Sequence, residues 1–181
     1  VAAASAASPP AERVVVAASV PNMHRPLPPV PAGLRPDDVT LVLFYQYVEP
    51  PWTRKQHSRA VAAVTRLARE NGVCGRGRCA PEGLNCTLTG NAAGVRAFCA
   101  GLRAWRPAVF DGTDFKLTDG LPRAQRFKSL TLRKAGELVA YGLEGARAPS
   151  LARHAGTHLT ADAYHAMLRE DDGGNTVVID V

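Results

Sequence analysis

The sequence lacks any apolar run long enough to cross a membrane. Its longest uninterrupted apolar stretches, such as residues 14–18 and 41–45, fall far short of the roughly 20 residues that a membrane-spanning helix needs. A chain of 181 residues with an apolar fraction of 46% can instead bury one core of ordinary size and part of a second one. We therefore expect no membrane partner.

The sequence also lacks cysteines at the spacing of metal-binding pairs. The four cysteines contain no C-x-x-C pair and have no neighbouring histidine at zinc-ligand spacing, so their pattern predicts no metal site. Cys79 and Cys99 fall where an expected strand and an expected helix need small apolar residues. We expect them to be buried free thiols in a reducing compartment.

A catalytic histidine set is absent as well. His57 lies in an expected helix, and three further histidines, His154, His158 and His165, come close to the end of the chain. None has a carboxylate or a serine at a spacing that suggests acid–base or nucleophilic catalysis. The sequence therefore predicts solvated or capping roles for them.

Acidic residues are scarce in two segments. Between Trp52 and Arg78 seven Arg or Lys residues accompany one acid, Glu70, and between Arg123 and Lys134 five basic residues accompany none. The formal net charge is +6 and the sequence pI is near 9.5. Such an excess draws a protein to polyanions such as RNA. A solvated basic face is the alternative interpretation.

Residues 1–39 form an extension without a helical or strand period. Eight of the fourteen prolines lie there, and alanine dominates the first eighteen positions. The composition is typical of the remains of an organelle-targeting transit peptide, and two V-x-A patterns, at residues 1–3 and 16–18, favour the chloroplast over the mitochondrion. A low-complexity linker is the alternative. An ordered extension would need a partner, such as a large organellar assembly, to offset its lost entropy.

From residue 40 the pattern becomes regular. Apolar residues on both faces predict a central strand at 40–48, and Thr53 with Gln56 resembles a capping box that opens a helix ending at Gly72. Asn91 can cap a second helix, which Pro107 ends. The remaining predicted strands are 75–80, 84–89, 113–118 and 127–133, with a turn at 135–136 into 137–141. This order predicts an α+β fold of the ferredoxin-like, split βαβ type.

A second unit follows a linker. Thr160 can cap a short helix through Arg169, and the apolar stretch Thr176–Val181 predicts a strand, in which we interpret Asp180 as structural. Such a helix and strand cannot bury enough surface alone, so the chain is expected to stop within a domain. The predicted organisation is an extension at 1–39, a ferredoxin-like domain at 40–145, a linker at 146–156 and a truncated domain at 157–181.

Three segments together resemble one family, the rhodanese-containing tRNA uridine hydroxylases. They are the strand at 41–48, the stretch 75–87, and residues 156–160 with 177–181. The second segment, GRGRCAPEGLNCT, is the most specific, because it is similar to the family stretch G-R-x-x-x-A-x-E-G-I-N-G-T. Cys86 stands where the family has Gly, which puts the local backbone conformation in question.

The resemblance implies a ferredoxin-like, acylphosphatase-like domain followed by the start of an α/β rhodanese domain. In that family a loop cysteine carries the chemistry, and this loop would lie beyond Val181. The chain alone is therefore expected to hold no catalytic residue and no cofactor. The parent protein would be a tRNA wobble-uridine hydroxylase or a rhodanese-type sulfurtransferase.

Two alternatives stay open for the function. One is a catalytically inactive, basic, RNA-contacting subunit of an organellar ribosome or a similar assembly. The other is a ferredoxin-like fold that binds a small molecule or another protein, although fold alone indicates no ligand. A cysteine loop after residue 181 would favour the enzyme over the inactive subunit.

The sequence offers two groups of basic residues as candidate RNA contacts. Arg123, Arg126 and Lys128 cluster at a predicted strand entry, and Arg76 and Arg78 lie in the resemblance segment. The partner expected for them is tRNA or another RNA.

The turn Glu82-Gly83-Leu84-Asn85 has two interpretations. Glu82 and Asn85 could contact tRNA or the neighbouring rhodanese loop, or Asn85 could bond its own backbone and fix the turn, with Gly83 as the flexible position.

Overall fold

The computed structural model of the chain describes residues 26–140, 142, 150, 153, 156–157, 159–170 and 176–179. The chain divides into two compact units, of which the larger runs from Val20 to Leu151. Of the extension at residues 1–39, in which we expected a targeting segment, residues 1–25 lie outside the described residues, as do His154, His158 and Asp180.

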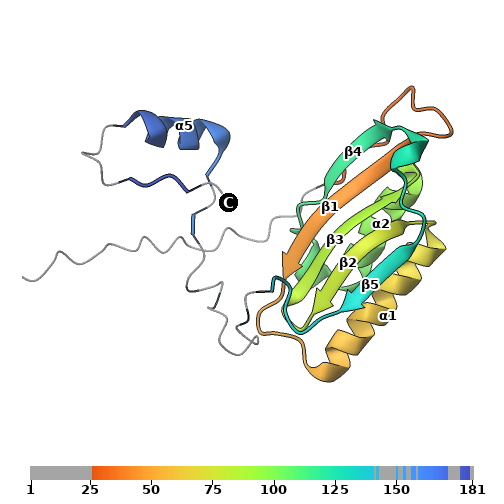
Figure 1. Cartoon of the computed structure of the whole chain (residues 1–181), viewed down its shortest axis with the longest axis horizontal. Coiled ribbons are helices and arrows are strands. Elements are labelled where there is room, and N and C mark those ends of the chain that lie inside the picture. Colours follow the sequence, from red (N-terminus) through yellow and green to blue (C-terminus); the bar gives the residue numbers. More distant parts are fainter. Residues whose placement is uncertain are drawn as a thin grey trace, which may run out of the picture. The chain divides into compact units, whose positions relative to one another are not determined.

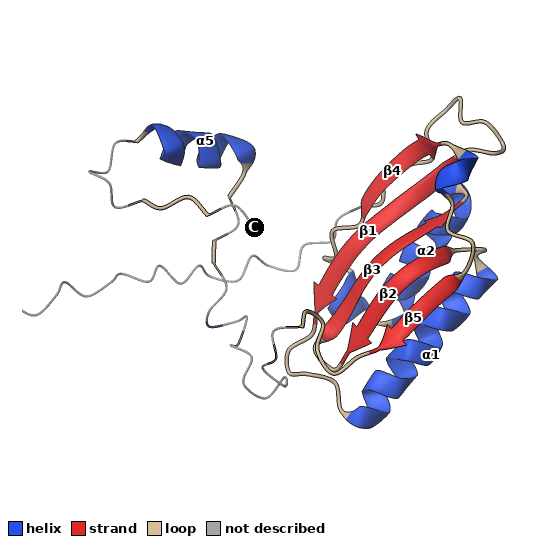
Figure 2. Cartoon of the chain, viewed as in Figure 1, coloured by secondary structure: helices blue, strands red, loops and turns tan. Residues whose placement is uncertain are grey.

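The larger unit is an open-faced α/β sandwich (Figure 1). Its strands are β1 (Val39–Tyr47), β2 (Cys74–Ala80), β3 (Gly83–Gly90), β4 (Lys116–Leu121) and β5 (Leu130–Lys134). Its helices are α1 (Arg54–Glu70), α2 (Ala92–Trp105) and the short α3 (Pro107–Phe110), with a 3-10 turn, η1, at Arg123–Gln125. Helices α1 and α2 pack on one face of the sheet, and no described helix of this unit lies on the opposite face (Figure 2).

The sheet has the strand order β4-β1-β3-β2-β5. Strands β1, β2, β3 and β4 pair antiparallel, as a split βαβ arrangement requires, and β5 adds to the edge of β2 in parallel. The α+β, ferredoxin-like prediction is confirmed. The expected start of a rhodanese domain stays a prediction.

Local signals position the two long helices. Thr53 and Gln56 form the predicted capping box of α1, and the Asn91 side chain accepts a hydrogen bond from Gly94 N at the start of α2. Both helices then place an apolar stripe on the sheet. The core also contains Phe44, Trp52, Phe98, Phe110 and Phe115, among other buried side chains from all these elements.

The proline-rich stretch before β1 packs on this unit instead of trailing from it. The Arg96 guanidinium of α2 donates to the carbonyls of Pro28 and Pro29 at 2.8 and 3.0 Å, and Leu27 packs against the core. Arg96 also makes a two-pronged ion pair with Asp119 of β4 at 2.9 Å. Ordered structure therefore starts well before residue 40.

Several predicted strand positions were wrong. Strands β4 and β5 each begin three residues later than expected. Before β4, Thr113 donates to the Gln46 side chain and Phe115 turns into the core. Before β5, Phe127 N donates to the Thr89 hydroxyl instead of to a strand partner. Residues 137–140 form no strand. Residues 176–179 form none either, since no strand of the described chain pairs with them and Val177 is 78% exposed.

Helix α5 (Ala161–Arg169) belongs to the second unit. The Thr160 side chain accepts a hydrogen bond from Ala163 N, so the predicted cap is confirmed. No helix among the described residues is both long enough and apolar enough to pass through a membrane.

Candidate nucleic-acid interface

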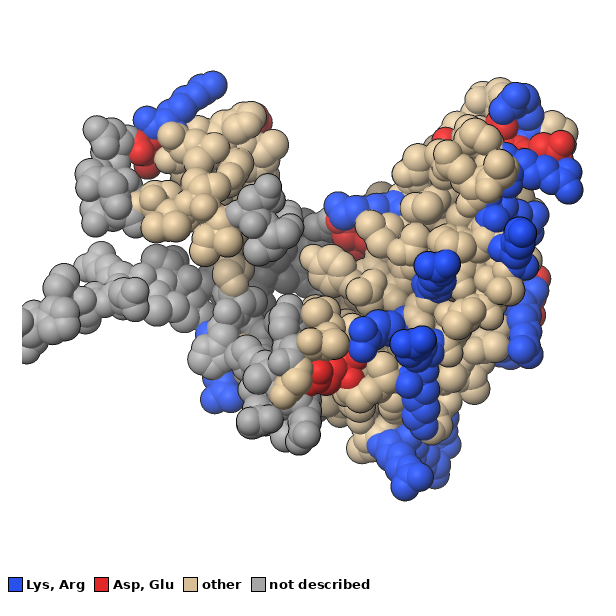
Figure 3. All heavy atoms as spheres, in the orientation of Figure 1, with Lys and Arg blue, Asp and Glu red and all other residues tan. Residues whose placement is uncertain are grey.

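The face of the sheet opposite the helices is polar and basic. Along β2, the residues Gly75, Gly77 and Cys79 point toward the helices, so the alternating residues Arg76 and Arg78 lie on the open face. Basic side chains gather over β2 and β5 on this face in Figure 3. The helices thus position the arginines by covering the other side of the strand.

Strand register brings a row of polar residues together across the sheet. Arg78 is paired with Asn85 of β3 on one side and with Arg133 of β5 on the other. Arg76 is paired with Thr87 and with Thr131 in the same way. A shallow hollow of about 280 Å³ lies between them, lined by Arg76, Gly77, Arg78, Asn85, Thr87, Thr131 and Arg133.

The hollow holds positive charge without a compensating carboxylate. In the described part of the chain none of its three arginines forms an ion pair. Arg78 donates to the Glu137 carbonyl at 3.2 Å, and its Nε is buried without a hydrogen-bond partner. Arg76 lies over the Phe127 ring, 5.7 Å from the ring centroid.

This arrangement costs stability. Like charges directly opposite each other on neighbouring strands repel, and a buried donor without a partner carries a desolvation penalty. Arg78 and Arg133 face each other on adjacent strands, about 5 Å apart along the hydrogen-bonding direction, and Arg78 also holds the buried unpartnered Nε. An anionic ligand would relieve the charge repulsion, because guanidinium forks match phosphate oxygens well.

The second predicted group lies in the connection between β4 and β5. Arg126 donates to the Gly72 carbonyl at 3.1 Å, and Lys128 is exposed. The fold places Asp37 3.5 Å from the Arg123 guanidinium, so Arg123 has an acidic partner that the sequence did not indicate. Phe127, between Arg126 and Lys128, joins this connection to Arg76 of the hollow.

The motif turn connects several segments of the fold. The Glu82 carboxylate accepts a hydrogen bond from Leu138 N, and the Glu82 carbonyl accepts one from Val48 N at 2.9 Å. Gly83 has φ +140°, and a Cβ there would lie 1.9 Å from the Gln46 carbonyl oxygen, so only glycine fits. Of the turn residues, Asn85 alone lines the hollow.

His57 is not solvated, contrary to the prediction. Its side chain is buried, and Nε2 lies 2.7 Å from the Cys79 carbonyl oxygen at the end of β2. Its spacing of three and seven residues from Ala60 and Val64, on the buried side of α1, was the signal that could have placed it. His165 on α5 is exposed.

The three buried cysteines are unsuited to nucleophilic chemistry. Cys79 and Cys99 are buried, as predicted, and burial raises the pKa of each to about 12. Burial also raises the pKa of the Cys86 thiol. A reactive cysteine needs the opposite shift, because the thiolate is the nucleophile. Within the described ranges no group of three metal-ligating side chains comes together.

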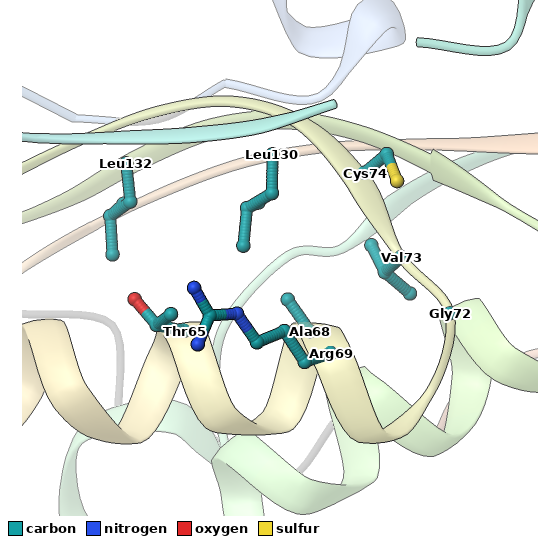
Figure 4. Close-up of a pocket in the computed structure, with 8 residues that line it drawn as sticks. All are labelled: Thr65, Ala68, Arg69, Gly72, Val73, Cys74, Leu130 and Leu132. Atoms are coloured by element: carbon teal, nitrogen blue, oxygen red, sulfur yellow. The ribbon is translucent and has the colours of Figure 1, made fainter. Parts of the chain in front are cut away.

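A second hollow lies between α1 and the edge strand β5. Its volume is about 530 Å³, and its lining includes Arg69 on α1 and Leu130 and Leu132 on β5, whose side chains point into the gap (Figure 4). Arg69 and Cys74 are its only ionisable lining residues, so it lacks the convergent polar groups of a small-molecule site.

Sequence reasoning missed the contribution of β5 to the basic hollow. Arg133 and Thr131 reach it only because β5 pairs in parallel with β2, a long-range pairing that no local pattern specifies. Alternation within the β2 segment, with glycines at every second position, was the signal for Arg76 and Arg78.

Comparison with known proteins gives a consistent picture. Residues 39–137 match the family described as "UPF0176 acylphosphatase like domain". The rhodanese-like domain-containing protein 6 of Arabidopsis thaliana is 28% identical over 140 residues, which cover 74% of this chain and 23% of that protein. The tRNA uridine(34) hydroxylase of Rhodococcus erythropolis is 33% identical over 106 residues, covering 56% of this chain and 33% of that enzyme.

A further relative, the tRNA uridine(34) hydroxylase of Staphylococcus carnosus, is 29% identical over 143 residues, which cover 79% of this chain and 41% of that enzyme. The chain thus spans between about a quarter and two fifths of the length of these relatives. The family match covers more than half of the chain and coincides with the sheet and its two helices. The chain belongs to the UPF0176 acylphosphatase-like domain family, the family of the tRNA uridine hydroxylases.

Proposed function

We propose that this chain is the amino-terminal RNA-binding domain of a rhodanese-like tRNA wobble-uridine hydroxylase, and that the basic hollow on the open sheet face contacts the RNA. One observation carries the proposal: Arg76, Arg78 and Arg133 line a single hollow without a carboxylate partner in the described chain. Relatives named as tRNA uridine(34) hydroxylases supply the substrate class.

The physical role of the domain is to hold the polyanion. Arginine side chains bind phosphate groups through two parallel hydrogen bonds, and each neutralised phosphate releases counterions. Arg126 and Lys128 extend the positive surface along the β4–β5 connection. The family resemblance assigns the chemistry to a cysteine loop of the parent protein, and burial raises the pKa of Cys79, Cys86 and Cys99, which disfavours their reactive thiolate forms. An organellar location, in the chloroplast or the mitochondrion, remains part of the proposal.

The test compares two double variants of equal charge change. Arg78→Ala/Arg133→Ala removes from the hollow two guanidinium groups that form no ion pair in the described chain. The control, Arg35→Ala/Arg66→Ala, removes two exposed guanidiniums that are already paired with Asp38 and Glu70. We measure tRNA affinity by fluorescence anisotropy over a series of salt concentrations.

The hollow variant should bind more weakly, and the negative slope of log affinity against log salt should become less steep by about 0.7 to 0.9 for each lost phosphate contact. The control should change the slope little. Equal slopes for wild type and the hollow variant would refute RNA contact at this site. The triple variant Arg123→Ala/Arg126→Ala/Lys128→Ala tests the second group, and an unchanged slope would place those three residues off the RNA.

A further inference from the structure

An exposed aromatic residue lies beside the basic hollow. Tyr45 of β1 is 66% exposed on the open face of the sheet. Its register partner is Asn85, which lines the hollow. Tyr47 lies two residues further along the same face, with its ring centroid 6.2 Å from that of Tyr45 and the ring planes at 70°. The hollow therefore has an aromatic surface on one side and guanidinium groups on the other.

The spacing of these groups fits a polynucleotide chain. One row across the sheet runs from Tyr45 through Asn85 and Arg78 to Arg133. Neighbouring strands are about 4.8 Å apart, so the backbone positions of Tyr45 and Arg78, two strands apart, are separated by roughly 10 Å. Along this row the protein presents an aromatic ring for stacking, then an amide that can hydrogen-bond a base edge, and then two guanidinium groups that can bind phosphates.

The exposed Tyr45 ring indicates whether the bound nucleic acid is single-stranded or a duplex. In a duplex the faces of the bases are covered by their neighbours, whereas unpaired bases can stack on aromatic side chains. A purely electrostatic surface would gain nothing from Tyr45 or from Leu43, which is 41% exposed on the same face. The charge of the hollow excludes a basic partner, and its hydroxyl and amide lining is too polar for an apolar one.

We propose that the open sheet face binds single-stranded RNA, with an unpaired base stacked on Tyr45 and the neighbouring phosphates held by Arg78 and Arg133. This inference rests on the proposed function, because it specifies how the same hollow contacts RNA. It adds a positioning role for β1, in which Tyr45 selects unpaired nucleotides while the arginines supply affinity without base selectivity.

The experiment uses the full chain and two labelled probes of equal length, a single-stranded oligouridine and an RNA duplex. Tyr45→Ala removes the stacking surface, and Tyr45→Phe keeps it. Tyr45→Thr is a second deletion variant that retains a residue suited to a strand. Tyr164→Ala, at a 44% exposed tyrosine of α5, is the matched control. Circular dichroism checks that each variant is folded.

Loss of one stacked base weakens binding by about 5- to 150-fold. We expect this loss for the single-stranded probe with Tyr45→Ala and Tyr45→Thr, and wild-type affinity with Tyr45→Phe and Tyr164→Ala. Duplex affinity should stay unchanged throughout. Wild-type binding by Tyr45→Ala, or equal losses on both probes, would overturn the inference.

The arginine double variant separates this inference from the proposed function. If Arg78→Ala/Arg133→Ala weakens binding of both probes while Tyr45→Ala binds like wild type, RNA binding stands and the stacking role fails. If the arginine variant also binds like wild type, the proposed function fails with it.

Discussion

At the scale of single residues, the most informative contact is the one between Gly77 and Cys86. Cys86 occupies a regular position in β3, so the cysteine at this family glycine position distorts no backbone. Its sulfur fills the space that a side chain on Gly77 would need, because a Cβ at Gly77 would lie 2.7 Å from Cys86 Sγ. The two positions therefore share one volume between neighbouring strands.

We expect Gly77→Ala to destabilise the domain by about 1–3 kcal/mol through overpacking. Cys86→Ala removes the sulfur and should make room for the new methyl group. Urea unfolding should therefore show that the double variant loses less free energy of unfolding than the two single variants lose together. We expect the difference to be at least about 0.5 kcal/mol. Strict additivity would show that the flexible Leu132 side chain, 2.9 Å from the same point, absorbs the change instead.

At the scale of elements, local patterns placed α1, α2 and the first three strands, because caps, periodicity and turn residues are all encoded within each segment. They misplaced the start of β4, where Phe115 leaves the strand direction to enter the core. They also gave no sign that β5 joins β2 in parallel, so the basic hollow was only half visible in the sequence. Pairing across the sheet depends on packing that no single segment contains.

Glu82, in the turn between β2 and β3, is predicted to have a structural role. Its carboxylate accepts the Leu138 N–H, and Leu138 is 1% exposed. Glu82→Ala leaves this donor without its partner, so we expect a loss of about 1–3 kcal/mol in the free energy of unfolding and faster hydrogen exchange at the Leu138 amide. Glu82→Gln keeps an acceptor oxygen and should lose less.

RNA affinity distinguishes this structural role from a direct contact by Glu82. The structural role predicts that folded Glu82→Ala binds tRNA within about twofold of wild type, because Asn85 and not Glu82 lines the hollow. A large loss of affinity with unchanged hydrogen exchange would assign Glu82 to the RNA surface instead.

At the scale of the whole molecule, the fold combines two faces with different tasks. The helix-covered face contains the aromatic core and three of the four thiols, and the open face carries the arginines and Tyr45. Under the proposed function, stability and ligand contact are separated, so we expect substitutions on the open face to change RNA affinity with little effect on the core. The two arginines of adjacent strands even make the domain slightly less stable than neutral residues would.

The buried thiols predict how the stability of the whole domain depends on pH. Burial raises the pKa of Cys79 and Cys99 from 9.0 to about 12, so the folded state keeps their protons at pH values where the unfolded state loses them. Stabilisation is complete below about pH 9 and declines as the pH rises toward 12, by up to about 1.4 kcal/mol per pH unit for each thiol.

Urea unfolding between pH 8 and 10 measures this dependence, with Cys99→Ala as the test variant and Cys74→Ala, at a half-exposed position, as the control for removing a thiol. Cys99→Ala should flatten the decline relative to wild type, and Cys74→Ala should leave it steep. Alkylation at pH 8 gives a second readout, since Cys74 should react first and the three buried thiols only on unfolding. Equal pH slopes in all three proteins, or rapid alkylation of Cys99 in the folded state, would contradict a closed core beneath the sheet.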